Sequence, residues 1–235
     1  MAIDWADKIR KVLAKAEDPA ATEEERASFL ASAQRLAKDH AVDMHNLGVS
    51  DPQRAEAIEG VRWFADDKHT TLIKAKRELL FGLATLNRCR TVLHGRAFVN
   101  LIGHQFDMEI VSMMFTSVML QLQTAMVVAE RTAHAVNVRS WRVSYAHGYV
   151  RRVIERLRYA DRSDASIPGT ALVLVDRTAL VNKRLADMYP KLRIATLKTS
   201  ADSGSGAYAR GVVDGSIADL GGARLGGSTD RHVLG

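Results

Sequence analysis

The feature that most constrains the fold is residues 105–133, where apolar side chains recur at helical spacing on more than one face. The apolar positions are Phe106, Ile110, Met113, Met114, Val118, Leu120, Leu122 and Met126. A helix that is apolar nearly all round must be covered by other elements. The longest apolar stretch inside it, DMEIVSMMFTSVML, is broken by polar residues and is too short to span a bilayer. We therefore expect this helix to be the buried centre of a larger domain.

Residues 1–48 predict a helical hairpin. A first amphipathic helix over residues 4–16 is stopped before Pro19, because the residue that precedes a proline avoids helical geometry. Thr22 and Glu25 have the spacing of a capping box, so a second helix begins there and ends between residues 40 and 48. Two short helices bury too little apolar surface to be stable alone. We expect the hairpin to dock on the rest of the chain.

The clearest strand signal lies at residues 89–103, where β-branched residues flank the sequence HGRA. This pattern predicts two strands joined by a tight turn at Gly95, and VRWFA at residues 61–65 predicts a further extended segment. Other helices are expected at residues 69–88, 139–160 and 205–220, and one more ends at Pro190. The run ALVLV at residues 171–175 is either a buried strand or the start of that helix, since periodicity does not separate the two.

These elements predict an α+β protein that is predominantly helical. Residues 1–48 form the hairpin domain, residues 61–220 form the main domain, and residues 221–235 form a glycine-rich tail. The main domain combines a small β-hairpin or sheet with the long buried central helix. The single cysteine, Cys89, is expected to be buried and inert, and it excludes an intrachain disulfide and a cysteine-based zinc site. The N-terminus has no signal-peptide pattern, so we expect a cytoplasmic protein. We expect no cofactor.

The net charge of +6 is concentrated in one segment. Residues 131–162 contain eight arginines and two acidic residues, and the rest of the chain carries no net charge. The helix expected there has an apolar side, which includes His147, and a second side of arginines and tyrosines. The residues of this Arg/Tyr face are Arg139, Arg142, Tyr145, Tyr149, Arg152 and Arg156. Guanidinium groups grip phosphates and aromatic rings stack on bases, so the face predicts nucleic-acid binding.

The Arg/Tyr face also has a simpler interpretation, in which its arginines are solvated or pair with acids such as Glu155. The opening hairpin does not suit groove reading, because its second helix begins with TEEER, whose carboxylates repel phosphates and favour the helix N-terminus. The leading hypothesis is a non-catalytic accessory protein that binds nucleic acid through the Arg/Tyr face. Phosphate contacts would supply the affinity, so binding is expected to be weakly sequence-specific and strongly salt-dependent.

Two other functions remain open. A protein-interaction module would bind a host or self partner through the acid-rich hairpin, aided by a stripe of small residues at Ala207, Gly211 and Gly215. A metal-dependent hydrolase would use His104 and Asp107, the weak candidates for metal ligands, although His-Glu-x-x-His spacing is absent. The glycine-rich segments match neither a P-loop nor a dinucleotide-binding fingerprint. The sequence therefore contains no catalytic constellation, which favours a protein that is not an enzyme.

The hairpin sequence resembles a known family. The segment KIRKVLAKAEDPAATEEERASFLASAQRLAKDHAVD resembles an N-terminal domain of unknown function, numbered 2786 in its series, that is seen in actinobacterial and bacteriophage proteins. Later segments resemble, in order, the domain that usually follows it: FVNLIGHQFDMEIVSMMFTSVMLQLQTAM, SWRVSYAHGYVRRVIERL, VDRTALVNKRLADMYP and AYARGVVDGSIADLGGARLGG. The resemblance implies an actinobacterial or phage source, with the host cytoplasm as the location if a phage encodes the protein. It implies no catalytic residues, because the family is uncharacterised.

Overall fold

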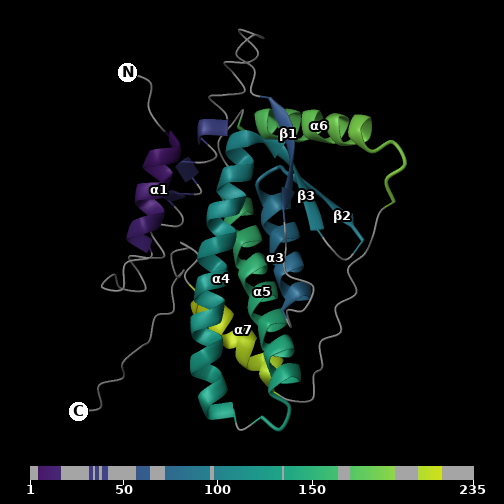
Figure 1. Ribbon diagram of the computed structural model, residues 1–235. Helices are drawn as coiled ribbons and strands as arrows, with labels where there is room; N and C mark the ends of the chain where they lie inside the picture. Colours follow the sequence, from purple (N-terminus) through teal and green to yellow (C-terminus); the bar gives the residue numbers. More distant parts are fainter. Residues whose placement is uncertain are drawn as a thin grey trace, which may run out of the picture.

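The computed structural model shows a predominantly helical α+β protein with one small sheet (Figure 1), which confirms the expected fold class. It describes residues 5–16, 32–33, 35–36, 39–41, 57–63, 72–95, 98–133, 135–163, 170–193 and 206–218. The helices are α1 (Trp5–Ala16), α3 (Ile73–Leu86), α4 (Gln105–Ala133), α5 (Val138–Ser163), α6 (Thr170–Met188) and α7 (Ala207–Ile217). The strands are β1 (Ile58–Trp63), β2 (Arg90–His94) and β3 (Phe98–His104).

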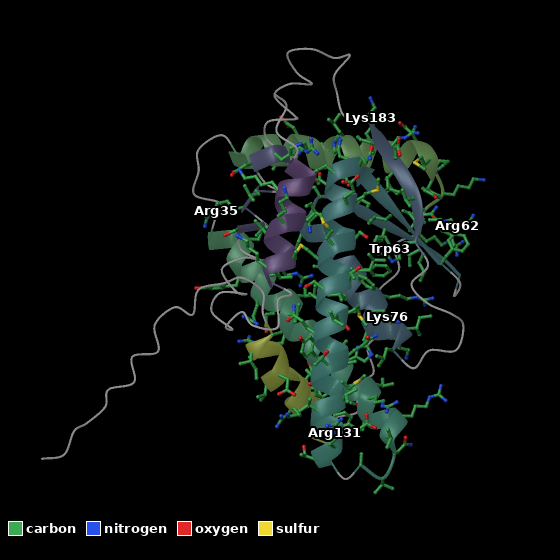
Figure 2. All side chains as sticks on the ribbon, turned by 60° about the vertical axis from the view of Figure 1, so that its left-hand side comes forward. Arg35, Arg62, Trp63, Lys76, Arg131 and Lys183 are labelled. Carbon is green, nitrogen blue, oxygen red and sulfur yellow. The ribbon has the colours of Figure 1, made fainter. Side chains whose placement is uncertain are left out.

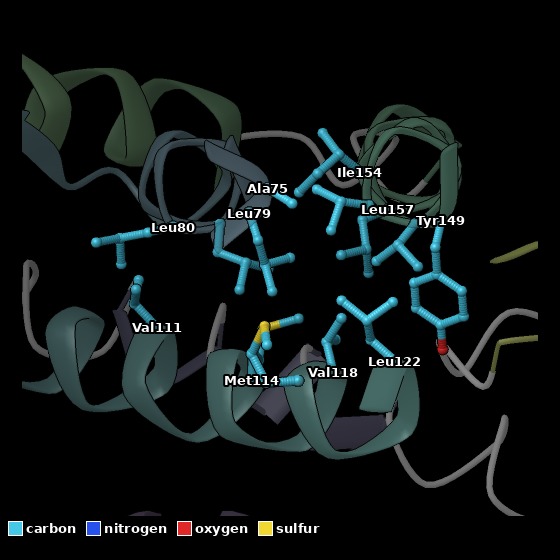
Figure 3. Packing of buried hydrophobic residues seen from close by; sticks show 14 of the residues in the cluster. Ala75, Leu79, Leu80, Val111, Met114, Val118, Leu122, Tyr149, Ile154 and Leu157 are labelled. Carbon is cyan, nitrogen blue, oxygen red and sulfur yellow. The ribbon is translucent and has the colours of Figure 1, made fainter. Parts of the chain in front are cut away.

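Helix α4 is the element around which the others pack, and its bounds are those expected from the sequence. Helices α1, α3, α5 and α7 and strand β3 all contact it. Figure 3 shows Val111, Met114, Val118 and Leu122 of α4 pointing toward apolar side chains of α3 and α5. These four side chains are at most 6% exposed. Burial of this apolar side holds α4 at the centre of the fold.

The whole of α4 is longer than its apolar run. The run DMEIVSMMFTSVML is too short to span a bilayer, whereas the helix extends from Gln105 to Ala133. Among the described helices it is the one long and apolar enough to do so. A core helix of a folded domain has the same length and composition. Packing against the neighbouring helices therefore accounts for its composition, although Leu120, Val127 and Val128 on the outward side are about half exposed.

The three strands form one antiparallel sheet in the order β1-β3-β2, so β3 is the central strand. Strands β2 and β3 form the expected hairpin, with Gly95 in the turn at a φ of 57°, a conformation that suits glycine. On the inner face, Val99 and Leu101 of β3 are buried in the main core. On the outer face, Ile102 forms a second, smaller core with Val181 of α6. The sheet is therefore packed between the helical core and α6.

Two ambiguous segments are resolved by this packing. The run ALVLV belongs to α6, so residues 171–175 are helical and do not form a strand. Strand β1 begins at Ile58, three residues before the segment expected to be extended, and pairs with β3 from Ile58 opposite His104 to Trp63 opposite Val99.

The opening hairpin docks on the main core, as expected. Ile9 of α1 is 0% exposed, and Val12 packs against the core cluster that includes α4 side chains. Ala33 and Leu36, from the region of the second expected helix, join the same cluster. The start and end of that second helix and the tail at 221–235 lie outside the described residues. The proposed domain boundaries therefore stay predictions.

Helices α5 and α7 approach each other backbone to backbone. A Cβ atom added to Gly148 of α5 would lie 2.2 Å from the carbonyl oxygen of Tyr208 in α7. A Cβ atom added to Gly211 of α7 would lie 2.1 Å from the carbonyl oxygen of Tyr145 in α5. Only glycine leaves room for this approach. The stripe of small residues on α7 therefore packs inside the protein, against α5.

We expect Gly211→Ala to lower the free energy of unfolding by about 1–3 kcal/mol, the usual cost of overpacking. The sign is diagnostic, because the same substitution inside an uncrowded helix normally stabilises it by up to about 1 kcal/mol. Urea unfolding monitored by circular dichroism measures the effect. Val213→Ala, on the exposed side of α7, is the control and should change the free energy by less than about 0.5 kcal/mol. A Gly211→Ala protein as stable as the wild type would contradict the backbone contact.

Candidate functional site

The structure separates the Arg/Tyr face into three parts along α5. At the start of the helix, Arg139 and Arg142 are exposed. Arg142 donates hydrogen bonds to both carboxylate oxygens of Glu130 on α4, each at 2.9 Å. This part of the face therefore follows the simpler interpretation, in which an acid of the protein pairs with the arginine.

The two tyrosines form the middle part, and their expected placement at a solvent-facing surface is wrong. Tyr145 and Tyr149 are 0% and 1% exposed, because α7 packs against this side of α5. The Tyr145 hydroxyl donates to Asp214 Oδ2 at 2.7 Å, and Arg210 Nε donates to the same oxygen at 3.0 Å. Burial and the hydrogen bond to Asp214 raise the pKa of Tyr145. Neither ring offers a face to a base.

Arg152 and Arg156 form the third part and bind the end of α7. Arg152 donates to Ser216 Oγ at 2.9 Å and to Glu155 at 3.0 Å. Arg156 donates to the carbonyl oxygen of Gly215 at 3.1 Å. Cations are favourable at a helix C-terminus, where carbonyl groups lack helical partners. The two arginines thus hold α7 in place, while 38% of the Arg152 side chain stays exposed.

A groove of about 410 Å³ lies beside Arg152, between α3, α5 and α7. We call it the arginine groove. Its charged lining residues are Arg151, Arg152, Arg158, Glu78 and Glu155, and its aromatic lining residues are Phe81 and Tyr208. Three cations against two carboxylates make the groove positive. Within the described part of the chain, Arg158 is exposed and pairs with no acidic side chain.

A buried histidine supports one wall of the arginine groove. His147 is 1% exposed, on the apolar side of α5 where the sequence predicts it. Its Nδ1 atom lies 2.9 Å from Glu78 Oε2, and Glu78 Oε1 lies 3.9 Å from Arg151 Nε. The Glu78 carboxylate is therefore fixed between a core histidine and Arg151. The separation of 3.9 Å from Arg151 is at the limit for an ion pair, so the contact leaves the Arg151 guanidinium group only partly engaged.

A second polar feature is a charge cluster buried where α4 begins. Asp107 is 0% exposed, and its two oxygens accept hydrogen bonds from Arg88 at 2.8 Å and from Arg177 at 3.0 Å. Burial by itself would raise the pKa of Asp107, but the two guanidinium groups outweigh it and hold the pKa below its usual range. Arg88 follows α3 and Arg177 belongs to α6. The cluster therefore joins three helices.

Arg88 occupies an unusual backbone conformation, with a φ of 60°. This left-handed conformation costs a residue with a side chain about 1–2 kcal/mol, and helix ends normally place glycine there. From this conformation the Arg88 side chain reaches Asp107, to which it donates a hydrogen bond. The sequence contains no local signal for the cluster, because Arg88 and Arg177 are 19 and 70 residues away from Asp107.

The two weak candidates for metal ligands are both buried. His104 is 4% exposed, and Asp107 has both oxygens bound by guanidinium groups, whose charge opposes a cation. In the part of the chain that the structure describes, no three His, Cys, Asp or Glu side chains are grouped to hold a metal ion. Cys89 is buried as expected, and burial followed by the charge of Asp107 raises the pKa of its thiol. The charge cluster is buried, whereas the arginine groove has exposed arginines in its lining.

We expect Asp107→Asn to lower the free energy of unfolding at neutral pH by about 3–5 kcal/mol, because two buried guanidinium groups lose their counter-charge. The pKa of Asp107 is lower in the folded than in the unfolded state. Its stabilising effect is therefore complete above the unfolded value of about 4 and is lost as the pH falls below it. The difference between variant and wild type should shrink in acid. Asp187→Asn, at an exposed site, is the control; an equal effect there would refute the assigned role.

Among the comparisons with known proteins, the one match lies in the hairpin. Residues 6–44 match the family model described as "Protein of unknown function (DUF2786)". No curated protein and no solved structure matches the chain. The match confirms the resemblance given for the hairpin sequence, whereas the resemblance of the later segments stays a prediction. Residues 6–44 are thus similar to a domain of unknown function, joined to a helical domain that presents the arginine groove.

Proposed function

We propose that the protein is a non-catalytic accessory protein that associates with nucleic acid through the arginine groove. The supporting observation is the gathering of three arginines and two aromatic rings in one groove on the most basic helix of the chain. The Arg151 side chain is 55% exposed, and its distance to Glu78 is at the limit for an ion pair. Guanidinium groups that the protein does not fully engage can bind phosphate oxygens in pairs of hydrogen bonds.

The spacing of the exposed arginines suits a phosphate backbone. Arg151 and Arg158 are seven residues apart on α5, which corresponds to about 10 Å along the helix axis. A stacked nucleic-acid strand rises about 3.4 Å per nucleotide, so the two side chains suit phosphates about three nucleotides apart. Arg152 lies between them and reaches the same groove. No base-reading side chain is required, so binding is weakly sequence-specific and falls steeply with salt.

This proposal shifts the interface from the Arg/Tyr face to its neighbour on α5. Arg152 belongs to both surfaces, whereas Tyr145, Tyr149 and Arg156 support the contact with α7. We place the function in the cytoplasm, or in the host cytoplasm if a phage encodes the protein. The actinobacterial or phage source stays part of the proposal.

A protein partner for the hairpin is the alternative proposal. The stripe at Ala207, Gly211 and Gly215 no longer supports it, because this stripe packs against α5. Its remaining support is the acid-rich composition of the hairpin. The third candidate, a metal-dependent hydrolase, lacks a ligand pair, since Asp107 is bound by two arginines.

The combined substitution of Arg151→Glu and Arg158→Glu should weaken binding of labelled DNA at least about tenfold at low salt, because two phosphate contacts become repulsions. Fluorescence anisotropy, titrated at several salt concentrations, measures the dissociation constant. The slope of log affinity against log salt should fall by about 2, one for each lost contact.

The matched control is Arg131→Glu with Arg139→Glu. This pair makes the same change in net charge at exposed sites on α4 and α5, at the end of the helices marked by Arg131 in Figure 2. Equal losses in both double variants would mean that net charge, and not the arginine groove, sets the affinity. Wild-type protein that binds no DNA at low salt would contradict the proposal and favour the protein partner.

A further inference from the structure

The outer face of the sheet is covered by α6 only in part. Side chains alternate along β3, so Phe98 and Asn100 lie on the same face as Ile102, which packs against Val181 of α6. Helix α6 ends at Met188. Beyond that residue, among the residues that the structure describes, Tyr189 and side chains of the strands themselves lie on the outer face of the sheet.

Five side chains gather there, and we call them the sheet-end cluster: Arg62, His94, Phe98, Asn100 and Tyr189. The guanidinium carbon of Arg62 lies 4.3 Å from the centre of the Phe98 ring. The His94 ring stacks on Phe98, with centroids 4.6 Å apart and planes inclined by 16°. Arg62 comes from β1 and His94 from β2, the strands on either side of β3. The cluster is thus a row of flat groups across the width of the sheet.

Hydrogen-bonding capacity remains unused in this cluster. Asn100 Nδ2 donates to the Tyr189 hydroxyl at 2.6 Å, and the Tyr189 ring lies 5.8 Å from the His94 ring. His94 Nε2 and Asn100 Oδ1, however, are buried and have no partner among the residues that the structure describes. Each buried polar atom without a partner costs about 1–3 kcal/mol. Side chains that served only to close the end of the sheet would be more stable if they were apolar.

Positive charge borders the sheet-end cluster. Arg62 itself is exposed, and Figure 2 shows it on the side of the molecule that carries the sheet. The exposed charged residues from 183 to 193 are four cations, Lys183, Arg184, Lys191 and Arg193, and one carboxylate, Asp187. Lys191 and Arg193 follow within four residues of Tyr189. A polyanion that contacts Tyr189 therefore meets Lys191 and Arg193, which are close to it in the chain.

We propose that the sheet-end cluster binds unpaired bases of single-stranded nucleic acid. This inference rests on the proposed function and names its substrate class. The Phe98 ring lies between the Arg62 guanidinium group and the His94 ring and holds both in place. An exposed guanidinium plane such as that of Arg62 stacks on bases of any sequence, each stacked base contributing about 1–3 kcal/mol. The bases of a duplex are covered by their neighbours and cannot lie on such a surface. The arginine groove binds phosphates of either form, whereas the sheet-end cluster selects the single strand.

The test compares three labelled ligands of equal length at low salt: a DNA single strand of mixed sequence, the same strand without bases, and a duplex. Wild-type protein should bind the normal strand at least about fivefold more tightly than the abasic strand. Phe98→Leu keeps an apolar side chain but removes the ring that holds Arg62 and His94 in place, so it should abolish this difference and leave abasic-strand and duplex binding unchanged. Phe98→Tyr keeps the ring and should retain the difference.

The outcomes separate this inference from the proposed function. Equal binding of normal and abasic strands by the wild type overturns the sheet-end cluster as a base-binding site, and so does a Phe98→Leu protein with wild-type preference. The proposed function still stands in both cases if Arg151→Glu with Arg158→Glu weakens binding. Wild-type protein that binds none of the three ligands overturns both. If Phe98→Leu fails to fold, Arg62→Ala removes an exposed member of the cluster and should reduce the same preference.

Discussion

Burial of the apolar side of α4 is the constraint on which the rest of the structure depends. Helices α1, α3, α5 and α7 each cover part of it, and the sheet follows directly because β3 leads into α4. The buried charge cluster fixes how this core meets α6, since Asp107 in the first turn of α4 holds Arg177 of α6. A long buried helix therefore determines which surfaces the smaller elements leave open, including the end of the sheet beyond α6.

The backbone contact between α5 and α7 decides which side of the basic helix is available. Gly148 and Gly211 allow the two helices to touch, and α7 then buries Tyr145 and Tyr149. The same helix supplies Tyr208 and Val212 to the arginine groove. The contact between α5 and α7 thus buries the tyrosines of the Arg/Tyr face, which the sequence favoured for nucleic-acid binding. The same contact forms part of the arginine groove.

The arginines of this protein act in three ways, so the net charge alone overstates the basic surface. Arg88 and Arg177 are buried around Asp107, and Arg156 binds the end of α7. Arg151 and Arg158 are exposed in the arginine groove. A guanidinium group that is hydrogen-bonded to a carboxylate or to a helix end is not available to bind phosphate. The exposed arginines, together with the flat groups of the sheet-end cluster, carry the two proposals.

The sequence by itself determined the helix at 105–133, the β-hairpin around Gly95, the docking of the opening hairpin and the burial of His147. Each of these follows from local periodicity, turn chemistry or the need to cover apolar surface. Only the tertiary structure decided that α7 buries the two tyrosines in the middle of the Arg/Tyr face of α5, because periodicity shows that a helix has two faces and not which neighbour covers them. It also decided the partners of Asp107 and the assembly of the sheet-end cluster from three strands and the end of α6. Those contacts join residues far apart in the chain, and no local pattern encodes a distance between them.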